Sequence, residues 1–84
     1  MEYTFKIDET LQDLIDTSIT DKDKQNTYGV LVNKFIRQYY PEDRVEAILN
    51  NKLADPTEQH QADFDELQVC RAAAKNYAKE LLGL

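Results

Sequence analysis

The chain has 84 residues, 42% of them hydrophobic, with two glycines, two prolines and a single cysteine. Its 16 acidic and 10 basic side chains give a net charge of −6, which disfavours nucleic acid and anionic membrane surfaces as partners, because phosphates are bound through lysine and arginine. This length predicts one small domain, residues 1–84, and one cysteine cannot form the internal disulfide that a small secreted domain usually needs, so we expect a cytoplasmic protein.

The N-terminal segment is predicted to be extended. Apolar Tyr3, Phe5 and Ile7 alternate with Thr4 and Lys6, and this period of two is typical of a half-buried strand. A single strand leaves its backbone groups unpaired. Residues 1–8 are therefore expected either to pair with another strand, within or between chains, or to lie on the domain as an extended arm.

Two amphipathic helices are expected next. Asp8 can cap a helix over residues 9–19, in which Leu11, Leu14, Ile15 and Ile19 recur at helical spacing. Residues 20–26 are polar and form either a hinge or the first turn of the following helix. The second helix is predicted over residues 27–39. Its apolar stripe consists of Tyr28, Leu31, Val32, Phe35 and Tyr39.

Two further helices are predicted after Pro41, which ends the preceding helix and can occupy the first position of the next one. The apolar face of this third helix consists of Val45, Ile48, Leu49 and Leu53. A fourth helix is predicted from Pro56 to Leu82, with Asp55 as its cap. Its stripe contains Phe64, Leu67, Cys70, Ala74, Tyr77, Ala78 and Leu81. The fold expected is mainly α, with three to four helices in a small bundle and a short extended N-terminal segment.

The two residues best suited to catalysis are predicted to be inert. Cys70 lies inside the apolar stripe of the last helix, and His60 precedes it by ten residues, about 15 Å along a helix, which is too far for a catalytic pair. His60 is interpreted as a capping or surface residue that can contact Asp63. No second histidine or cysteine supplies the spacing of a zinc site. No catalytic, cofactor-binding or metal-ligating residue is predicted, and no small-molecule substrate is expected.

Two binding motifs are matched only in part. Asp21, Asp23 and Gln25 have the spacing of a calcium loop, but Asn26 occupies its glycine position and Val32 its bidentate glutamate position. Residues 28–51 have the outline of a helix-turn-helix. The second of these helices carries three acids, which would repel phosphates. These acids are Glu42, Asp43 and Glu46, against one arginine, Arg44. Neither a calcium site nor DNA binding is predicted.

The last helix carries a second apolar face. Ala62, Val69 and Ala73 lie opposite its main stripe and beside Asn76, and small residues at this spacing allow another helix to approach closely. The high helix propensity of alanine is an alternative explanation for the same residues. Together with the N-terminal strand pattern, this face favours a protein partner, which includes a second copy of the chain as a homodimer.

Residues 28–80 resemble small helical proteins encoded by phages and prophages. The resemblance lies in Tyr28, Ile36-Arg37, Tyr39-Tyr40, Glu42-Asp43, the segment 46–49, Phe64, Arg71 and the segment 75–79. It implies virion-morphogenesis genes nearby and transfers no functional residue. The function expected is a non-catalytic protein–protein interaction module that acts in particle assembly or on a host protein. The alternative is an acidic regulator, a decoy that occupies a basic nucleic-acid-binding surface.

Overall fold

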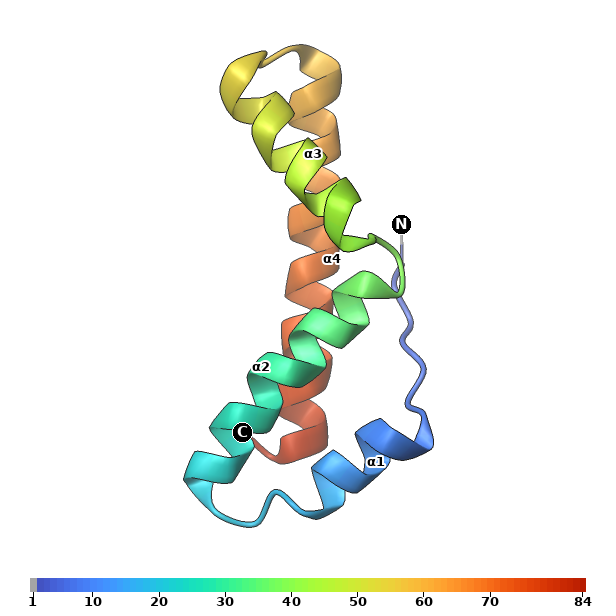
Figure 1. Cartoon of the computed structure of the whole chain (residues 1–84), viewed down its shortest axis with the longest axis vertical. Coiled ribbons are helices and arrows are strands. Elements are labelled where there is room, and N and C mark those ends of the chain that lie inside the picture. The colour runs from blue at the N-terminus through green and yellow to red at the C-terminus, as the bar shows by residue number, and fades with distance from the viewer. Residues whose placement is uncertain (1) are drawn as a thin grey trace.

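The structure, a computed structural model, describes residues 2–84, and within them it contains four helices and no strand (Figure 1). The helices are α1 (Glu9–Asp16), α2 (Asp21–Arg37), α3 (Glu42–Ala54) and α4 (Glu58–Leu82). Residues 2–8 precede α1 as an extended arm, the N-terminal arm. The predicted mainly α fold with an extended N-terminal segment is thus confirmed.

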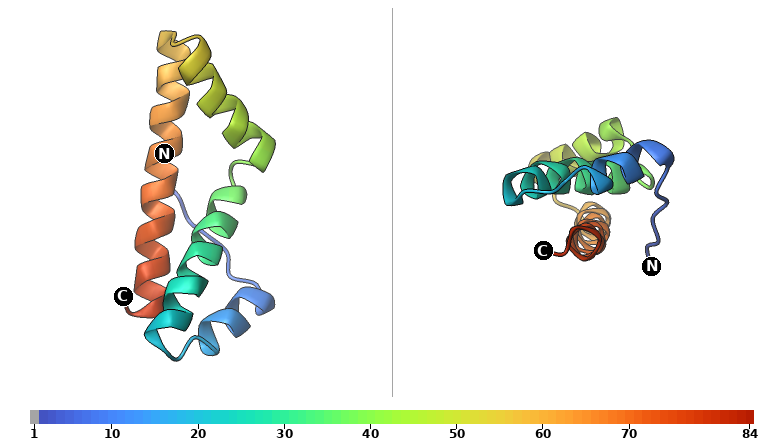
Figure 2. Two further views of the ribbon diagram at one scale, coloured as in Figure 1. Left: turned by 60° about the vertical axis from the view of Figure 1, so that its left-hand side comes forward. Right: turned by 90° about the horizontal axis from the view of Figure 1, so that it is seen from below.

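α4 is the longest helix and runs along the long axis of the molecule, which is 45 Å long (Figure 1). α2 and α3 follow each other along the same side of α4, each packing against it, and α1 folds back against α2. Figure 2 shows the resulting two layers, with α4 in one and the three other helices in the second. The N-terminal arm returns from α1 along the side of the molecule toward the middle of α4 (Figures 1 and 2).

α1 is shorter than predicted. Asp8 caps it as expected, accepting a 2.8 Å hydrogen bond from the Leu11 N–H. The helix ends at Asp16 instead of residue 19, where the hydroxyl groups of Thr17 and Ser18 hydrogen-bond main-chain carbonyls of the preceding turn. Such local bonding competes with helix continuation. Ile19, predicted on the buried face, is consequently 80% exposed, so that assignment was wrong.

α2 is longer than predicted, because it begins at Asp21 instead of residue 27. The polar stretch is its first turn, one of the two alternatives, and not a hinge. Thr20 caps it, and Asp23 completes a reciprocal capping box with Thr20. These two hydrogen bonds satisfy N–H groups that an uncapped end would leave unpaired, which lets a strongly polar segment start the helix. α2 also ends two residues early, at Arg37, so Tyr39 lies in the turn that follows.

The starts of α3 and α4 both differ from the prediction by a residue or two. Pro41 is the cap of α3 and not its first helical residue. α4 is capped by Thr57, whose hydroxyl accepts from the His60 N–H at 3.2 Å, whereas Asp55 was predicted as the cap. Leu53, predicted on the buried face of α3, is 84% exposed, because it lies in the last turn of α3, at the far end of the molecule. α4 ends at Gly83, which has a φ of 69° and closes the helix as a left-handed cap.

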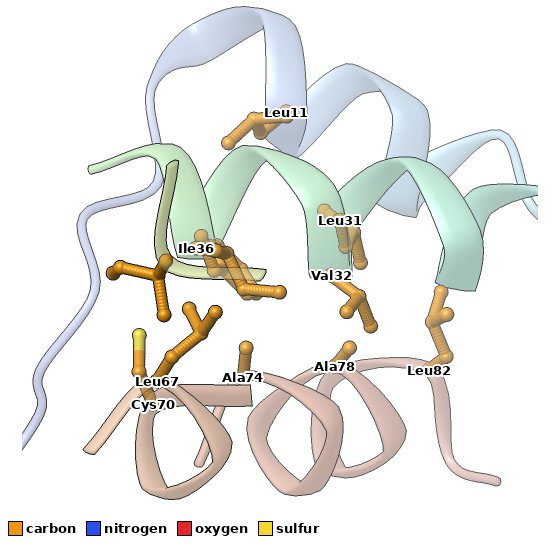
Figure 3. Close-up of a cluster of buried hydrophobic side chains, with 11 residues drawn as sticks. Leu11, Leu31, Val32, Ile36, Leu67, Cys70, Ala74, Ala78 and Leu82 are labelled. Carbon is orange, nitrogen blue, oxygen red and sulfur yellow. The ribbon is translucent and has the colours of Figure 1, made fainter. Parts of the chain in front are cut away.

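The core lies between α2 and α4 and extends to single residues of α1 and α3 (Figure 3). Small side chains on α4, Cys70, Ala74 and Ala78, face Val32 and its neighbours and allow the two helices to approach closely. The buried apolar residues are Leu11, Leu31, Val32, Phe35, Ile36, Ile48, Leu67, Cys70, Ala74, Ala78 and Leu82. Most stripe residues predicted from periodicity are therefore in the core or packed against it.

Candidate interaction surface

The N-terminal arm contacts the bundle through its alternating aromatic side chains. Phe5 stacks on Phe35 of α2, with ring centroids 5.0 Å apart, and lies 6.1 Å from the ring of Tyr77 on α4. The ring of Tyr3 meets Tyr39 edge-on at 4.8 Å. Aromatic pairs in these geometries add about 0.5–1.5 kcal/mol beyond the area they bury. The arm thereby covers one side of the seam between α2 and α4.

The main chain of the arm is held along one edge by two side chains from the end of α2. The Tyr39 hydroxyl accepts from the Thr4 N–H at 3.2 Å and donates to the Thr4 carbonyl at 2.6 Å. The Gln38 amide does the same for Lys6, accepting from its N–H at 2.9 Å and donating to its carbonyl at 2.8 Å. The predicted extended arm is therefore present, and side chains take the place of a partner strand within the described residues.

A polar contact joins the start of the arm to α4. The Tyr3 hydroxyl donates to Oε1 of Glu66 at 2.6 Å and lies 3.2 Å from the Tyr40 hydroxyl. Burial, followed by the hydrogen bonds to Glu66 and Tyr40, raises the pKa of Tyr3 well above its usual value. The phenol therefore stays neutral and remains a hydrogen-bond donor over the whole physiological pH range.

The arm separates two hollows on the surface. The first, about 610 Å³, lies on the side of Gln38 and Tyr39 and includes Lys6 and Asp8 in its lining. The second, about 290 Å³, lies between the arm and α4, and we name it the arm–α4 cleft. It is lined by Tyr3, Thr4, Phe5, Ala73 and Tyr77. Its walls are mainly aromatic and aliphatic, so it suits an apolar side chain better than a charged one.

The second apolar face predicted on the last helix borders this cleft. Val69 is 48% exposed, Ala62 is exposed, and half-buried Ala73 lines the cleft itself. Seven residues separate Ala62 from Val69, about two helical turns, so these side chains form a strip along one side of α4. The cleft and the strip lie along the same side of α4, and each has accessible small or aliphatic side chains, with Asp65 and Glu66 between Ala62 and Val69.

Cys70 lies where the sequence predicted, fully buried in the core. Burial is the first cause, and the negative charge of Glu66 the second, of a pKa raised above the ordinary value of a cysteine. A thiol with a raised pKa carries little thiolate, the form that reacts as a nucleophile. This side chain therefore packs in the core as a small apolar group.

His60 lies in the first turn of α4 and is partly exposed. Its Nδ1–H donates to the main-chain carbonyl of Asp55, so it helps to close the turn between α3 and α4. The contact with Asp63 that the sequence suggested is not the one formed, since Asp63 accepts from Gln59 at 2.8 Å. Among residues 2–84, no group of three or more His, Cys, Asp or Glu side chains is arranged to hold a metal ion.

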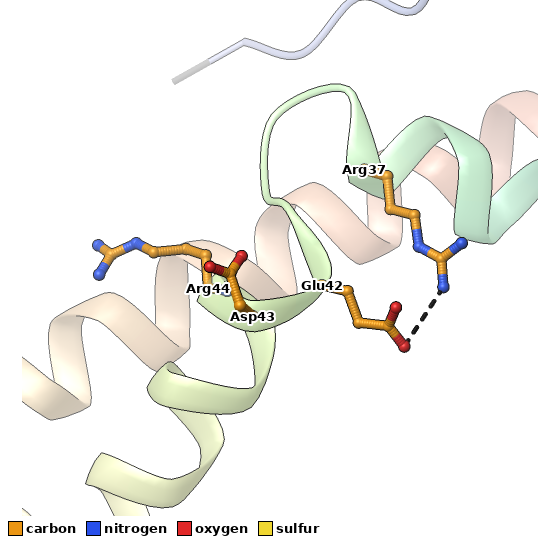
Figure 4. A network of polar contacts seen from close by, with 4 residues as sticks. All are labelled: Arg37, Glu42, Asp43 and Arg44. Atoms are coloured by element: carbon orange, nitrogen blue, oxygen red, sulfur yellow. Dashed lines mark hydrogen bonds and ion pairs between the residues drawn. The ribbon is translucent and has the colours of Figure 1, made fainter.

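The two partly matched motifs lie in ordinary helical structure. Residues 21–26, which have part of the calcium-loop spacing, are the first turns of α2. At the corner between α2 and α3, the Arg37 guanidinium lies 3.6 Å from the carboxylate of Glu42, while Arg44 points away (Figure 4). The acidic side chains of Glu42 and Asp43 occupy the start of α3, the helix that a helix-turn-helix protein would insert into DNA.

Three residues that matter for this surface were given no contact or role in the sequence analysis. Gln38 and Tyr40 follow the end of α2, and Glu66 lies in the middle of α4. Their partners are 32 to 63 residues away along the chain, so no local spacing indicates these contacts. The only signal available was the pair of tyrosines at 39–40, directly before Pro41, where the helix must end.

Comparisons with protein-family models, with curated proteins and with solved structures give no match to this chain. No helix within residues 2–84 combines the length and the apolar character that crossing a membrane requires.

Proposed function

We propose that the chain is a non-catalytic protein–protein interaction module. The observation that carries this proposal is the accessible apolar surface that the arm–α4 cleft and the strip with Val69 form along one side of α4. Val69 is a β-branched side chain, 48% exposed beside a cleft with aromatic walls, and accessible apolar surface of this kind is typical of binding sites. The buried thiol of Cys70 and the structural hydrogen bond of His60 agree with a role in binding.

The proposal also includes the process in which the partner acts. The resemblance of residues 28–80 to phage-encoded helical proteins supports a partner in particle assembly or among host proteins. The genes that flank the coding sequence test this part directly. Virion-morphogenesis genes on either side would support it, and a neighbourhood of unrelated metabolic genes would contradict it.

The contact surface is tested with a charge placed on the strip. Immobilised wild-type chain and Val69→Glu are compared for the proteins they retain from an extract of the source organism, with Val30→Glu as the matched control. Val30 is 41% exposed on α2, away from the cleft. We expect Val69→Glu to lose the specific partners and Val30→Glu to keep them. Equal retention by both variants would contradict the proposed surface.

Salt concentration separates this proposal from the decoy alternative. Contacts between exposed charges weaken with salt, because counterions screen them, while apolar contacts persist. We expect the partners to remain bound in high salt. Light scattering after size-exclusion chromatography shows whether the partner is a second copy of the chain.

A further inference from the structure

The N-terminal arm uses only one of its two main-chain edges. In an extended chain, the N–H and C=O groups of alternate residues point to opposite edges. Thr4 and Lys6 point toward Gln38 and Tyr39, which satisfy all four of their main-chain groups. Within residues 2–84, no group hydrogen-bonds the main chain of Phe5 or Ile7. We call this edge, whose Phe5 and Ile7 groups form no hydrogen bond within residues 2–84, the open edge.

This open edge belongs to a segment that is already ordered. The rings of Tyr3 and Phe5 are fixed against α2 and α4, and the opposite edge is hydrogen-bonded, so the arm is held in extended form before any partner arrives. Pre-ordering lowers the entropy cost of binding. An ordered strand with one unpaired edge is a template for the addition of another strand.

Side-chain space lies beside the edge. The arm–α4 cleft, about 290 Å³, is lined by Phe5 of the arm and by Ala73 and Tyr77 of α4. Alternate side chains of a strand that paired with the arm would point into this cleft, toward an aromatic and aliphatic wall. The space is of the size of one or two aliphatic side chains, so these positions call for residues such as valine.

The charges near the cleft favour a basic partner. Glu80 lies two helical turns after Ala73, on the same side of α4, and it is exposed. Lys75 and Lys79 lie about 200° and 240° around the helix from Ala73, on the far side. Lys6 lines the hollow on the other side of the arm and not this cleft. A lysine or arginine that alternates with the apolar residues would therefore find opposite charge at Glu80, about 10 Å along α4 from Ala73.

We propose that the open edge of the N-terminal arm binds an extended segment of a partner protein by strand addition, a segment that alternates aliphatic and basic residues. This inference rests on the proposed interaction function and names the kind of partner that the arm–α4 cleft takes. The bound segment would hydrogen-bond Phe5 and Ile7, insert an aliphatic side chain beside Ala73, and place a basic one near Glu80.

The test uses a short blocked peptide of alternating lysine and valine, added to the full chain labelled with ¹⁵N. In the free chain, the amides of Thr4 and Lys6 should exchange slowly with solvent and those of Phe5 and Ile7 quickly. With the peptide at about 100 times its dissociation constant, protection of Phe5 should rise about 100-fold. The same peptide with an N-methyl group on every amide has no N–H donor on either edge, so it should give no protection.

Two variant pairs locate the bound peptide. Ala73→Gln fills the cleft and should abolish peptide binding, whereas Ala72→Gln, on the exposed neighbouring position, should leave it intact. Glu80→Gln should weaken binding about threefold, as for a contact between exposed charges, and Glu46→Gln on α3 should not. Melting curves monitored by circular dichroism confirm that all four variants fold.

Three results would overturn the inference. The first is equal binding of the N-methylated peptide, which would show attraction by charge without main-chain pairing. The second is protection of Phe5 that appears without peptide as the chain is concentrated, which would show pairing with a second copy. The third is no protection by the peptide while Val69→Glu still abolishes partner capture; there the interaction function stands and strand addition fails.

Discussion

The two ends of α4 are packed in different ways. We call the end with residues 67–84, α1, α2 and the N-terminal arm the base, and the end with residues 42–66 the tip hairpin. Ten of the eleven buried apolar residues lie in the base, and Ile48 is the only one from α3. The tip hairpin instead has an exposed Leu53 and a lysine, Lys52, whose ammonium group lies 3.5 Å from the ring centroid of Phe64.

This difference teaches where the fold obtains its stability. Burial of apolar surface is the main stabilising contribution, and it is concentrated where three elements meet over the second half of α4. Two packed helices leave most side chains open to solvent on one side, so the tip hairpin contributes only Ile48 to the buried apolar core. We therefore expect the tip hairpin to open locally, with a free energy lower than that of global unfolding.

The largest effect is expected from Phe35→Ala. Phe35 is fully buried at the centre of the base and contacts the rings of Phe5 and Tyr77. Its truncation should lower the free energy of unfolding in urea by about 3–5 kcal/mol. Amide exchange in the tip hairpin should keep its local opening free energy, because the base is intact in the opened state. If Phe35→Ala instead lowered the free energy of hairpin opening by as much as it lowers the global stability, the two regions would unfold together.

A smaller effect is expected from Ile48→Ala in the tip hairpin. Ile48 is 2% exposed, and its truncation should cost about 2–3 kcal/mol, at the low end for a buried isoleucine, because two helices can close around the gap. Both the global stability and the local opening free energy should fall by this amount, since the mutation destabilises only the closed hairpin. Hydrogen exchange that changes in the base but not at residues 42–66 would contradict the comparison.

Tyr3 joins the arm to α4 near the boundary between the two regions, and its contribution should depend on pH. Its raised pKa means that the neutral phenol is favoured in the folded state. The stabilisation is therefore complete below the ordinary pKa of tyrosine, about 10, and is lost as the pH rises above it. Tyr3→Phe, which lacks the hydroxyl, should be about 1–1.5 kcal/mol less stable than wild type at neutral pH.

This difference between wild type and Tyr3→Phe should disappear within about one pH unit above pH 10, because each unit of unfavourable ionisation costs about 1.4 kcal/mol. Urea unfolding of both proteins across this pH range measures it. A difference that stays constant through the alkaline range would show that the hydroxyl contributes by packing alone and not as a donor to Glu66.

Periodicity identified the four helices and most of the core, because a helix that buries one face repeats its apolar residues every three to four positions. The ends of the helices were less accurate. Thr20 and Thr57 act as caps through side-chain hydrogen bonds, and the polar residues that follow Thr20 carried no apolar period to reveal the helix. Ile19 and Leu53 fit the periodicity but lie at ends where no element covers them.

The surface that we propose as the interaction site was only partly predictable. The alternation of residues 3–7 indicated an extended segment, because an extended chain that buries one face alternates apolar and polar residues whatever it packs against. Which helices it would cover depends on pairs such as Phe5 with Phe35 and Tyr3 with Glu66, which are 30 and 63 residues apart. No local pattern encodes such pairs, so the arm–α4 cleft could be found only in the folded chain.

The smallest effects are expected from the two threonine caps, which form a matched pair across the two regions. Thr20 caps α2 in the base and Thr57 caps α4 in the tip hairpin, and replacing either with alanine should cost about 1 kcal/mol. Thr20→Ala should lower the global stability alone. Thr57→Ala should lower both the global stability and the free energy of hairpin opening, because only the closed hairpin contains its hydrogen bond to the His60 N–H.

Hydrogen exchange of the amides in α3 and in the first turns of α4 distinguishes these two outcomes, with urea unfolding as the measure of global stability. A Thr20→Ala variant in which residues 42–66 exchange faster, by the same factor as in Thr57→Ala, would mean that α2 and the tip hairpin form one cooperative unit. The thin packing around Ile48 would then be sufficient to couple α3 to the base, and the division of α4 into two regions would describe its packing without describing its unfolding.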